Sequence, residues 1–278
     1  MAATYKKIDR TAVDALLHGL LKSLESMGGQ RSVILDDMGT LMCQYLVETR
    51  TIPHVDRPGK SSSALKRLLI RNGFAPLATA PNLVEIMAQK AGGHDAGTPT
   101  GRGTSKEGVK VDWVLYEAIL YGMTKALDDQ LGLQAQLILD RIGTLMLDYL
   151  IDVGAIKRSE DLNILLQRVV DYFVKAGYAK SFSFELEGAP PNTFVSRYES
   201  ARYYTNVFRR TQREGSALLA CPLCVIGHSL WATRGWRFGN IFEVQISSGG
   251  KVLSRARVYP ATERFTESDA LRLSRTKL

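Results

Sequence analysis

Two cysteines and a histidine stand close together in the last third of the chain, as Cys221, Cys224 and His228. Spacings of three and four residues place these side chains along one face of a helix. Thiolate and imidazole groups are ligands that zinc prefers, and Glu243 or water could supply the fourth. Cysteine is also among the residue types most often buried as a small apolar side chain. We favour buried core over a zinc site here, so zinc is not an expected cofactor.

A thiolate beside His228 could also act as a nucleophile. Such chemistry needs an oxyanion site and substrate access, which a sequence does not reveal. The chain has no GxxxxGK(S/T), HExxH or GxSxG motif, and no paired carboxylates or Ser/His/Asp set stands in a supporting context. The sequence therefore favours a protein without catalytic activity of its own.

Aromatic residues are concentrated between residues 198 and 242, where they could line a pocket for a small apolar or aromatic molecule. Tyrosine hydroxyls and tryptophan N–H groups would orient a polar end of that ligand. Arginines interleaved with the rings could instead hold phosphates while the rings stack bases. An ordinary core with a cationic rim is the third alternative. The candidate ligand-binding residues are Tyr198, Tyr203, Tyr204, Phe208, Trp231, Trp236 and Phe242.

Length and composition limit the classes of protein. The chain has 278 residues, of which 45% are hydrophobic and 23% charged, enough for one large or two modest folded domains. No apolar run approaches the ~20 residues that a bilayer span needs, and the start lacks a signal-peptide core. Three cysteines do not make a disulfide scaffold for a chain of this size. We expect a cytoplasmic protein with reduced thiols.

The positive charge lies in the C-terminal third. Residues 201–278 hold 13 Lys and Arg against 5 Asp and Glu, a difference equal to the net charge of +8 for the whole chain. A basic face could meet an acidic protein, a membrane surface or a nucleic acid. Nucleic acid is not favoured, because the arginines are dispersed and no recognised nucleic-acid motif accompanies them.

One segment recurs about a hundred residues later, which indicates an internal duplication. Residues 17–24 match residues 120–127, and residues 34–42 match residues 138–146, with the tetrapeptide Gly-Thr-Leu-Met identical in both. Apolar residues at helical spacing predict a two-helix hairpin in each copy. Glycine costs about 1 kcal/mol relative to alanine inside a helix, so Gly39 and Gly143 predict a close helix crossing in both copies.

Local signals place the ends and buried faces of these helices. Thr11 and Asp14 resemble a capping box at the start of the first helix, and Asp112 is placed to cap the first helix of the second copy. Val33 and Leu137 belong to the apolar stripes of the second helices, so we expect them to face inward.

The copies diverge after a third helix. In the first copy this helix is predicted to be capped by Ser61–Ser63 and to end at Gly73; in the second it is predicted to be capped by Ser159 and to end at Gly177. The first copy continues into a short helix over residues 82–91. The second continues into strands over residues 182–186, 194–198, 240–247 and 251–259, with a turn at Gly249-Gly250 and a helix from Pro222 to about Arg234.

The predicted fold class is therefore α+β, with a helical half-copy before a complete α+β domain that contains a helical hairpin and an antiparallel sheet. The expected divisions are a helical half-repeat over residues 1–91, a Gly/Thr-rich linker over 92–110, the α+β domain over 111–260 and a basic tail over 261–278.

This order of elements, with Cys221-Pro222-Leu223-Cys224-Val225-Ile226-Gly227, Gly235, Gly239 and Phe242-Glu243-Val244, resembles the 4-vinyl-reductase-type hydrocarbon-binding domain. That domain is related in fold to the small subunits of the transport protein particle. The resemblance covers residues 112–260, and its helical part is echoed in residues 11–75. It implies a dimer interface made by helices and an α+β part that encloses a small apolar or aromatic molecule.

The resemblance does not extend to the metal site of the family. Zinc-binding members have a cysteine-rich hairpin where this chain has Ile246, Gly249, Gly250 and Ser254, which are not zinc ligands.

We therefore expect a non-enzymatic sensor or binding protein for a small apolar or aromatic ligand. The two hairpins would form a pseudo-dimer within one chain, or a homodimer. The alternative is an assembly or adaptor subunit that uses its basic C-terminal face to bind an acidic protein, a membrane surface or a nucleic acid. Ligand binding needs an enclosed apolar cavity, whereas an adaptor permits a filled core.

Overall fold

The computed structural model describes residues 7–52, 68–69, 71–72, 109–187, 193–216, 218, 220–233 and 235–260. The described chain has the predicted α+β class, with helices and an antiparallel sheet that share one hydrophobic core. Several predictions concern residues outside the described ranges. They are most of the linker, the short helix over residues 82–91, the bounds of the first copy's third helix at Ser61–Ser63 and Gly73, and the basic tail.

Both predicted hairpins are confirmed. The first consists of α1 (Arg10–Leu24) and α2 (Gln30–Glu48), and the second of α5 (Trp113–Leu131) and α6 (Ala135–Asp152). A glycine with positive φ stands at the same place in each turn, with φ 54° at Gly28 and 53° at Gly132. Residues with a Cβ atom rarely adopt this backbone conformation, so glycine permits the turn in both copies.

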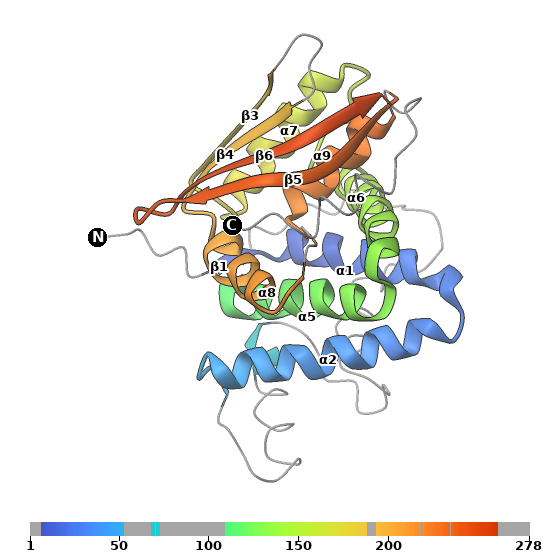
Figure 1. The fold of residues 1–278 in the computed structure, drawn as a ribbon, viewed down its shortest axis with the longest axis vertical. Coiled ribbons are helices and arrows are strands. Elements are labelled where there is room, and N and C mark those ends of the chain that lie inside the picture. Colours follow the sequence, from blue (N-terminus) through green and yellow to red (C-terminus); the bar gives the residue numbers. More distant parts are fainter. Residues whose placement is uncertain are drawn as a thin grey trace.

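The two hairpins pack on each other reciprocally. Helix α1 lies against α6, and α2 lies against α5; α2 is at the end of the molecule away from the sheet, whereas α6 reaches up to α9 (Figure 1). A Cβ atom at Gly19 would lie 2.8 Å from the carbonyl oxygen of Ile142, and one at Gly122 would lie 2.7 Å from that of Met38. Because these two contacts join equivalent positions of the two copies, the copies are related by an approximate twofold axis.

A short strand before each hairpin continues this symmetry. Strand β1 (Lys7–Asp9) pairs antiparallel with β2 (Lys110–Asp112), and Ile8 lies opposite Val111 at the centre. Both central side chains are fully buried. The duplication therefore begins before the first helix, with Lys-Ile-Asp in one copy and Lys-Val-Asp in the other.

The second copy continues into α7 (Leu162–Lys175) and a four-stranded antiparallel sheet with the order β3-β4-β6-β5. Helix α9 (Pro222–Ala232) enters between the second and third strands in sequence, and it lies with α7 behind the sheet in Figure 1. The four predicted strands are confirmed, although β5 begins at Trp236, before the predicted start at residue 240. The strands are β3 (Ser181–Glu187), β4 (Thr193–Glu199), β5 (Trp236–Ile246) and β6 (Lys251–Pro260).

Gly143 connects the hairpins to the α+β part. A Cβ atom there would lie 2.2 Å from the carbonyl oxygen of Val225 on α9, so only glycine lets α6 and α9 approach so closely. The close crossing predicted at Gly143 is thus confirmed. Gly39, the equivalent residue of α2, is buried.

The predicted inward positions of Val33 and Leu137 are wrong. Val33 is 47% exposed and Leu137 is 71% exposed. They occupy equivalent positions near the beginning of α2 and α6, where the side chains point away from the opposite hairpin. The apolar stripe is therefore shorter than the helix in both copies.

Two predicted caps are also replaced by neighbouring aspartates. Asp9, instead of Thr11 and Asp14, caps α1, and its carboxylate accepts the Thr11 backbone N–H at 2.8 Å. Asp161, instead of Ser159, caps α7 and accepts two backbone N–H groups. A carboxylate is favoured at this position because it also interacts with the positive end of the helix dipole.

The reciprocal packing predicts different costs for a methyl group at two helical glycines. Gly122→Ala should destabilise the protein by about 1–3 kcal/mol, because the new Cβ meets the backbone of α2. Gly227→Ala is the control, since nothing lies within 4 Å of its Cβ position, and it should be neutral or stabilising by up to about 1 kcal/mol. Urea unfolding measures both, and equal effects would contradict the packing.

Candidate functional site

Three tyrosines and two cysteines meet behind the sheet, and we call these residues the tyrosine–thiol cluster: Tyr178, Tyr198, Tyr204, Cys221 and Cys224. They come from the end of α7, strand β4, a π-helix (Tyr203–Phe208) and the start of α9. Every side chain of the cluster is at most 5% exposed. The site is therefore a polar centre within the hydrophobic core.

Local sequence features bring these groups together. Pro222 at the first position of α9 fixes the start of the helix, so Cys221 becomes the N-cap and Cys224 lies one turn later. Gly177 has φ 89° and ends α7, which lets the Tyr178 backbone N–H bond back to the Phe173 carbonyl oxygen at 2.9 Å. The π-helix then presents Tyr204 to the same thiols.

Each tyrosine hydroxyl of the cluster contacts sulfur. The Tyr178 hydroxyl donates to the Cys221 sulfur at 3.1 Å. The Tyr198 hydroxyl lies 2.9 Å from the Cys224 sulfur and 3.6 Å from the Cys221 sulfur. The Tyr204 hydroxyl lies 3.3 Å from the Cys224 sulfur and donates to the Tyr198 hydroxyl at 3.3 Å. Each hydroxyl of the cluster thus has a hydrogen-bond partner within the cluster.

The two thiols differ in acidity. Burial alone raises the pKa of the Cys221 thiol, but hydrogen bonds from Cys224, Tyr178 and Tyr198 outweigh it, so its pKa is lowered to about 7. Burial and the neighbouring Cys221 raise the pKa of Cys224. A cysteine at a helix N-terminus commonly has a lowered pKa, which agrees with the N-cap position of Cys221. Cys221 is therefore the thiol that ionises first.

The predicted aromatic residues are largely in contact with one another. Tyr203, Tyr204 and Phe208 are buried, with ring centroids 5.2 Å apart for the two tyrosines and 5.5 Å for Tyr204 and Phe208. Trp231 is half-buried against the core. Trp236 and Phe242 belong to β5, and their side chains lie outside the described set. The described rings pack as a core and do not surround a hollow.

Two hollows among the described residues are both open to solvent, so neither is an enclosed apolar cavity. One, of about 590 Å³, lies on the outer face of the sheet. The other, of about 520 Å³, lies between α6 and the end of α9. The lining of the first combines polar and charged residues with apolar ones, and it includes Ser183, Arg197, Tyr198, Ile246 and Leu253.

His228 does not join Cys221 and Cys224 in a metal-ligating group. Its imidazole Nδ1 lies 4.0 Å from a carboxylate oxygen of Asp140 on α6. Glu243, the other candidate ligand, pairs with Arg255 on the sheet at 2.6 Å. Across the part of the chain that the structure describes, no three His, Cys, Asp or Glu residues could hold a metal ion. Cys224 and His228 do lie on one helix, as predicted, but the His228 side chain packs against α6 and not beside the two thiols.

A second polar network joins the first hairpin to the π-helix. Glu117 on α5 is 2% exposed and accepts hydrogen bonds from Tyr45 at 3.2 Å, Arg202 at 2.8 Å and Asn206 at 2.7 Å. Breaking a buried ion pair typically costs about 3–5 kcal/mol, because the remaining charge has no partner. Glu117 therefore holds α2, α5 and the π-helix together.

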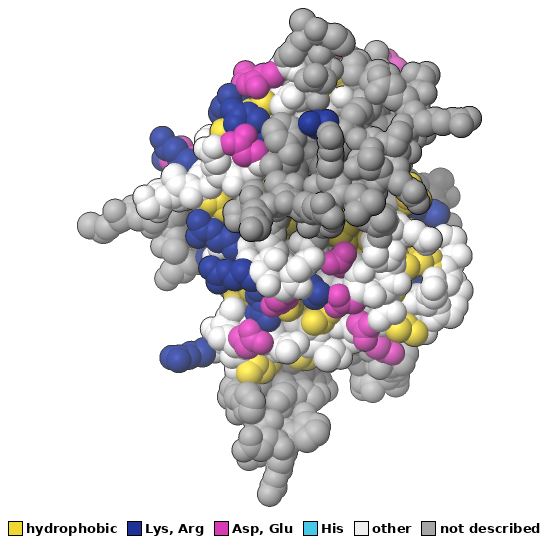
Figure 2. Space-filling model, in the orientation of Figure 1, with side chains coloured by type: hydrophobic (Ala, Val, Ile, Leu, Met, Phe, Trp, Pro, Cys, Tyr) yellow, Lys and Arg dark blue, Asp and Glu magenta, His cyan; other side chains and the backbone are white. Residues whose placement is uncertain are grey.

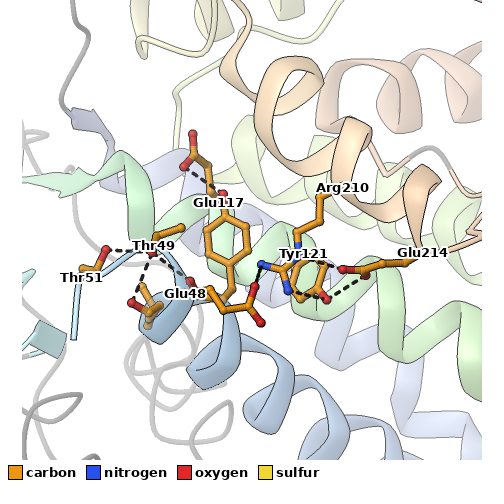
Figure 3. A network of polar contacts seen from close by, with 9 residues as sticks. Glu48, Thr49, Thr51, Glu117, Tyr121, Arg210 and Glu214 are labelled. Carbon is orange, nitrogen blue, oxygen red and sulfur yellow. Dashed lines mark hydrogen bonds and ion pairs between the residues drawn. The ribbon is translucent and has the colours of Figure 1, made fainter. Parts of the chain in front are cut away.

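Arg210 extends this connection, as Figure 3 shows. Arg210 belongs to α8 (Arg209–Arg213). Its guanidinium forms ion pairs with Glu48 of α2 and with Glu214, each at 2.9 Å. It also lies over the Tyr121 ring, 4.1 Å from the ring centroid, in a cation–π contact. The arginine thus contacts both hairpins and the segment that carries Tyr204.

The pseudo-symmetric copy of this network is different in chemistry. His18 and Tyr149 lie 5.1 Å apart, in the arrangement that Tyr121 and Tyr45 adopt at 5.3 Å. Asp14 occupies the position equivalent to Glu117 and pairs with Arg10 at 2.6 Å. The geometry of the duplication is kept, while only one side is connected to the π-helix.

Sequence reasoning missed Tyr178, Glu117 and Tyr45. The signal for Glu117 is a carboxylate on the buried stripe of a helix, because a charge there needs a partner. Tyr178 follows the glycine that ends a predicted helix, a position where an apolar side chain often returns to the core. The π-helix has no sequence signal that distinguishes it from an α-helix.

The comparisons with known proteins give no family. No protein-family model matches the chain, and no curated protein matches its sequence. A solved structure of a Tt H-NOX variant is 10% identical, with a TM-score of 0.33, and the match covers 82% of this chain and 98% of that chain. Similarity at this level assigns neither a family nor a function.

The described surface mixes positive and negative charge. Figure 2 shows Lys and Arg side chains close to Asp and Glu side chains, with apolar side chains scattered among them. Lys180 pairs with Glu199 at 2.7 Å on the sheet. Within the described ranges, no helix is both long enough and apolar enough to span a membrane.

Burial of His228 predicts a pH-dependent stability. Burial lowers the pKa of His228 to about 4, against an ordinary value of 6.5, so the folded protein holds it neutral. Between pH 6.5 and 4 the unfolded chain binds a proton that the folded chain excludes, so the free energy of unfolding falls with falling pH by about 3 kcal/mol. Asp140, whose carboxyl pKa is raised by burial, is the acidic group that faces it.

The variant His228→Gln lacks this titration. Chemical unfolding across the same pH range should therefore show a shallower pH dependence for the variant than for the parent protein. Identical slopes in the two proteins would mean that the imidazole titrates with the same pKa in the folded and unfolded chains.

Proposed function

We propose that this protein is a non-catalytic sensor module that responds to a small aromatic or apolar molecule at the tyrosine–thiol cluster. The observation that carries the proposal is the convergence of the predicted ligand residues Tyr198 and Tyr204 on one buried polar centre. The cluster lies in the α+β part, which the resemblance to the hydrocarbon-binding domain implies would enclose the ligand. An aromatic molecule with one hydroxyl group could replace a tyrosine ring there and keep its hydrogen bond.

The π-helix supplies the means of response. Because π-helical turns are rare and occur frequently at functional sites, Tyr203–Phe208 is the segment expected to rearrange when a ligand enters. Asn206 and Arg202 attach this segment to Glu117, and thereby to both hairpins. A ligand that prefers the rearranged conformation would shift the population and change the helical surface.

The first hairpin, in this proposal, takes the place of a partner subunit. Support comes from the reciprocal contacts at Gly19 and Gly122, which occupy surfaces that two separate chains would otherwise share. The protein would thus be a pseudo-dimer with one complete α+β unit.

An adaptor is the second candidate, and the close packing of the described rings favours it. An adaptor needs no cavity and would bind through its surface. The two functions differ in what accompanies the purified protein.

Native mass spectrometry of protein purified from its own host separates the two candidates. The sensor should carry a stoichiometric small-molecule adduct that is lost on denaturation. Phenol added to the empty protein should restore a bound state in the parent and bind at least tenfold more weakly to Tyr204→Trp, which fills the site. Protein that arrives with a macromolecular partner, and binds neither a host molecule nor phenol, would contradict the sensor and support the adaptor.

A further inference from the structure

Cys221 and Cys224 have the arrangement of a pair that can be oxidised together. They are the N-cap and the third residue of α9, in the sequence Cys-Pro-Leu-Cys. Residues three positions apart on a helix have Cβ atoms ~5–6 Å apart, whereas a disulfide needs ~3.5–4.5 Å. Both sulfurs contact the same Tyr198 hydroxyl, at 3.6 Å for Cys221 and 2.9 Å for Cys224. Cys221 is the N-cap and has an extended backbone (φ −64°, ψ 118°), so it lies outside the helical turn and can bring its Cβ toward Cys224.

The surroundings of the two cysteines suit them to different roles, one as the attacking thiolate and the other as the resolving thiol. Tyr178 donates a hydrogen bond to the Cys221 sulfur, and the helix N-terminus adds a favourable dipole, so this sulfur is suited to be the attacking thiolate. Cys224 stays protonated beside it and is suited to resolve the oxidised intermediate. Cys43 on α2 provides the contrast, because burial raises its pKa and it has no cysteine within four residues in sequence.

We propose that Cys221 and Cys224 form a reversible dithiol–disulfide pair, a redox site oxidised by a small peroxide. The Cys221 thiolate attacks one peroxide oxygen, forming a sulfenic acid and releasing hydroxide, which takes up a proton to become water. The Cys224 thiol then attacks the sulfenic sulfur, and a second water leaves as the disulfide forms. Two thiols and hydrogen peroxide thus give one disulfide and two waters, and an external dithiol reverses the reaction by exchange.

Burial restricts which oxidant can act. Cys221 is fully buried and Cys224 is 5% exposed, so a molecule the size of hydrogen peroxide can reach them by small fluctuations, whereas a protein disulfide cannot dock. Oxidation removes both S–H groups from the cluster and leaves Tyr198 and Tyr204 facing weaker acceptors. The redox state of the pair is thereby coupled to β4 and to the π-helix. This inference does not depend on ligand binding.

The experiment uses the full chain with Cys43→Ser, so that only the pair remains. The folded protein is treated with hydrogen peroxide, acid-quenched, denatured and alkylated with iodoacetamide, and its intact mass is measured. We expect both alkylation sites to disappear with the loss of two hydrogens and no gain of oxygen, and to return after dithiothreitol. Two alkylated thiols after peroxide treatment, or a disulfide formed only after prior unfolding in urea, would overturn the proposal.

A second variant tests the order of attack. With Cys43→Ser and Cys224→Ser together, peroxide should leave a sulfenic acid on Cys221 that dimedone traps, because no resolving thiol is present. The matched Cys43→Ser and Cys221→Ser protein should give at least tenfold less adduct. Equal trapping at both cysteines would contradict the assigned roles, and the intact-mass result with Cys43→Ser alone still decides whether the pair forms, even if these variants do not fold.

Discussion

The approach of helix backbones at Gly19 and Gly122 is the constraint on which the rest of the structure depends. At each glycine, a helix of one hairpin comes so close to the opposite hairpin that a Cβ atom would meet a carbonyl oxygen at under 3 Å. These contacts fix the two copies about an approximate twofold axis, and the pairing of Ile8 with Val111 lies on the same axis. Gly143 then sets α9 against α6, which determines where the thiols of α9 lie.

The polar groups inside this framework form two connected networks. Glu117 and Arg210 connect the hairpins to the segment from Arg202 to Glu214, and the tyrosine–thiol cluster connects that segment to the sheet and α9. Unpaired buried charges and hydroxyls are costly. Each network is therefore stable only when all the helices and strands that supply its partners are in place. A change at the thiols, by ligand binding or by oxidation, would therefore alter contacts of the first hairpin. That hairpin is far from the cluster in the sequence.

Much of the fold follows from pattern. Repeated Gly-Thr-Leu-Met, helical spacing and alternating strands were sufficient for the hairpins, α9 and the sheet, because apolar periodicity reflects the buried face directly. Val33 and Leu137 were placed wrongly, since a stripe does not reveal how far along a helix its partner extends. The glycines of the reciprocal crossings were in the matched segments, but periodicity gave no reason to distinguish them from tolerated ones.

The site was less predictable than the fold. The cysteines and several aromatics that meet at the cluster were identified from their types, whereas Tyr178 and Glu117 depend on tertiary contacts between residues far apart in the chain. The zinc hypothesis shows what helical spacing leaves open. The spacing places His228 on the same helix face as the cysteines, but it does not predict that the imidazole lies beside Asp140. Ligand binding by the aromatic set stays a prediction.

The most direct test of this account is whether the two copies pair within one chain. Lys7 and Asp112 are register partners in β1 and β2, so cysteines at both positions, with Cys43→Ser, should oxidise to a disulfide within the monomer. The mass of the oxidised protein under denaturing, non-reducing conditions should be that of a single chain. A covalent dimer would mean that the hairpins pair between chains, and it would contradict the pseudo-dimer.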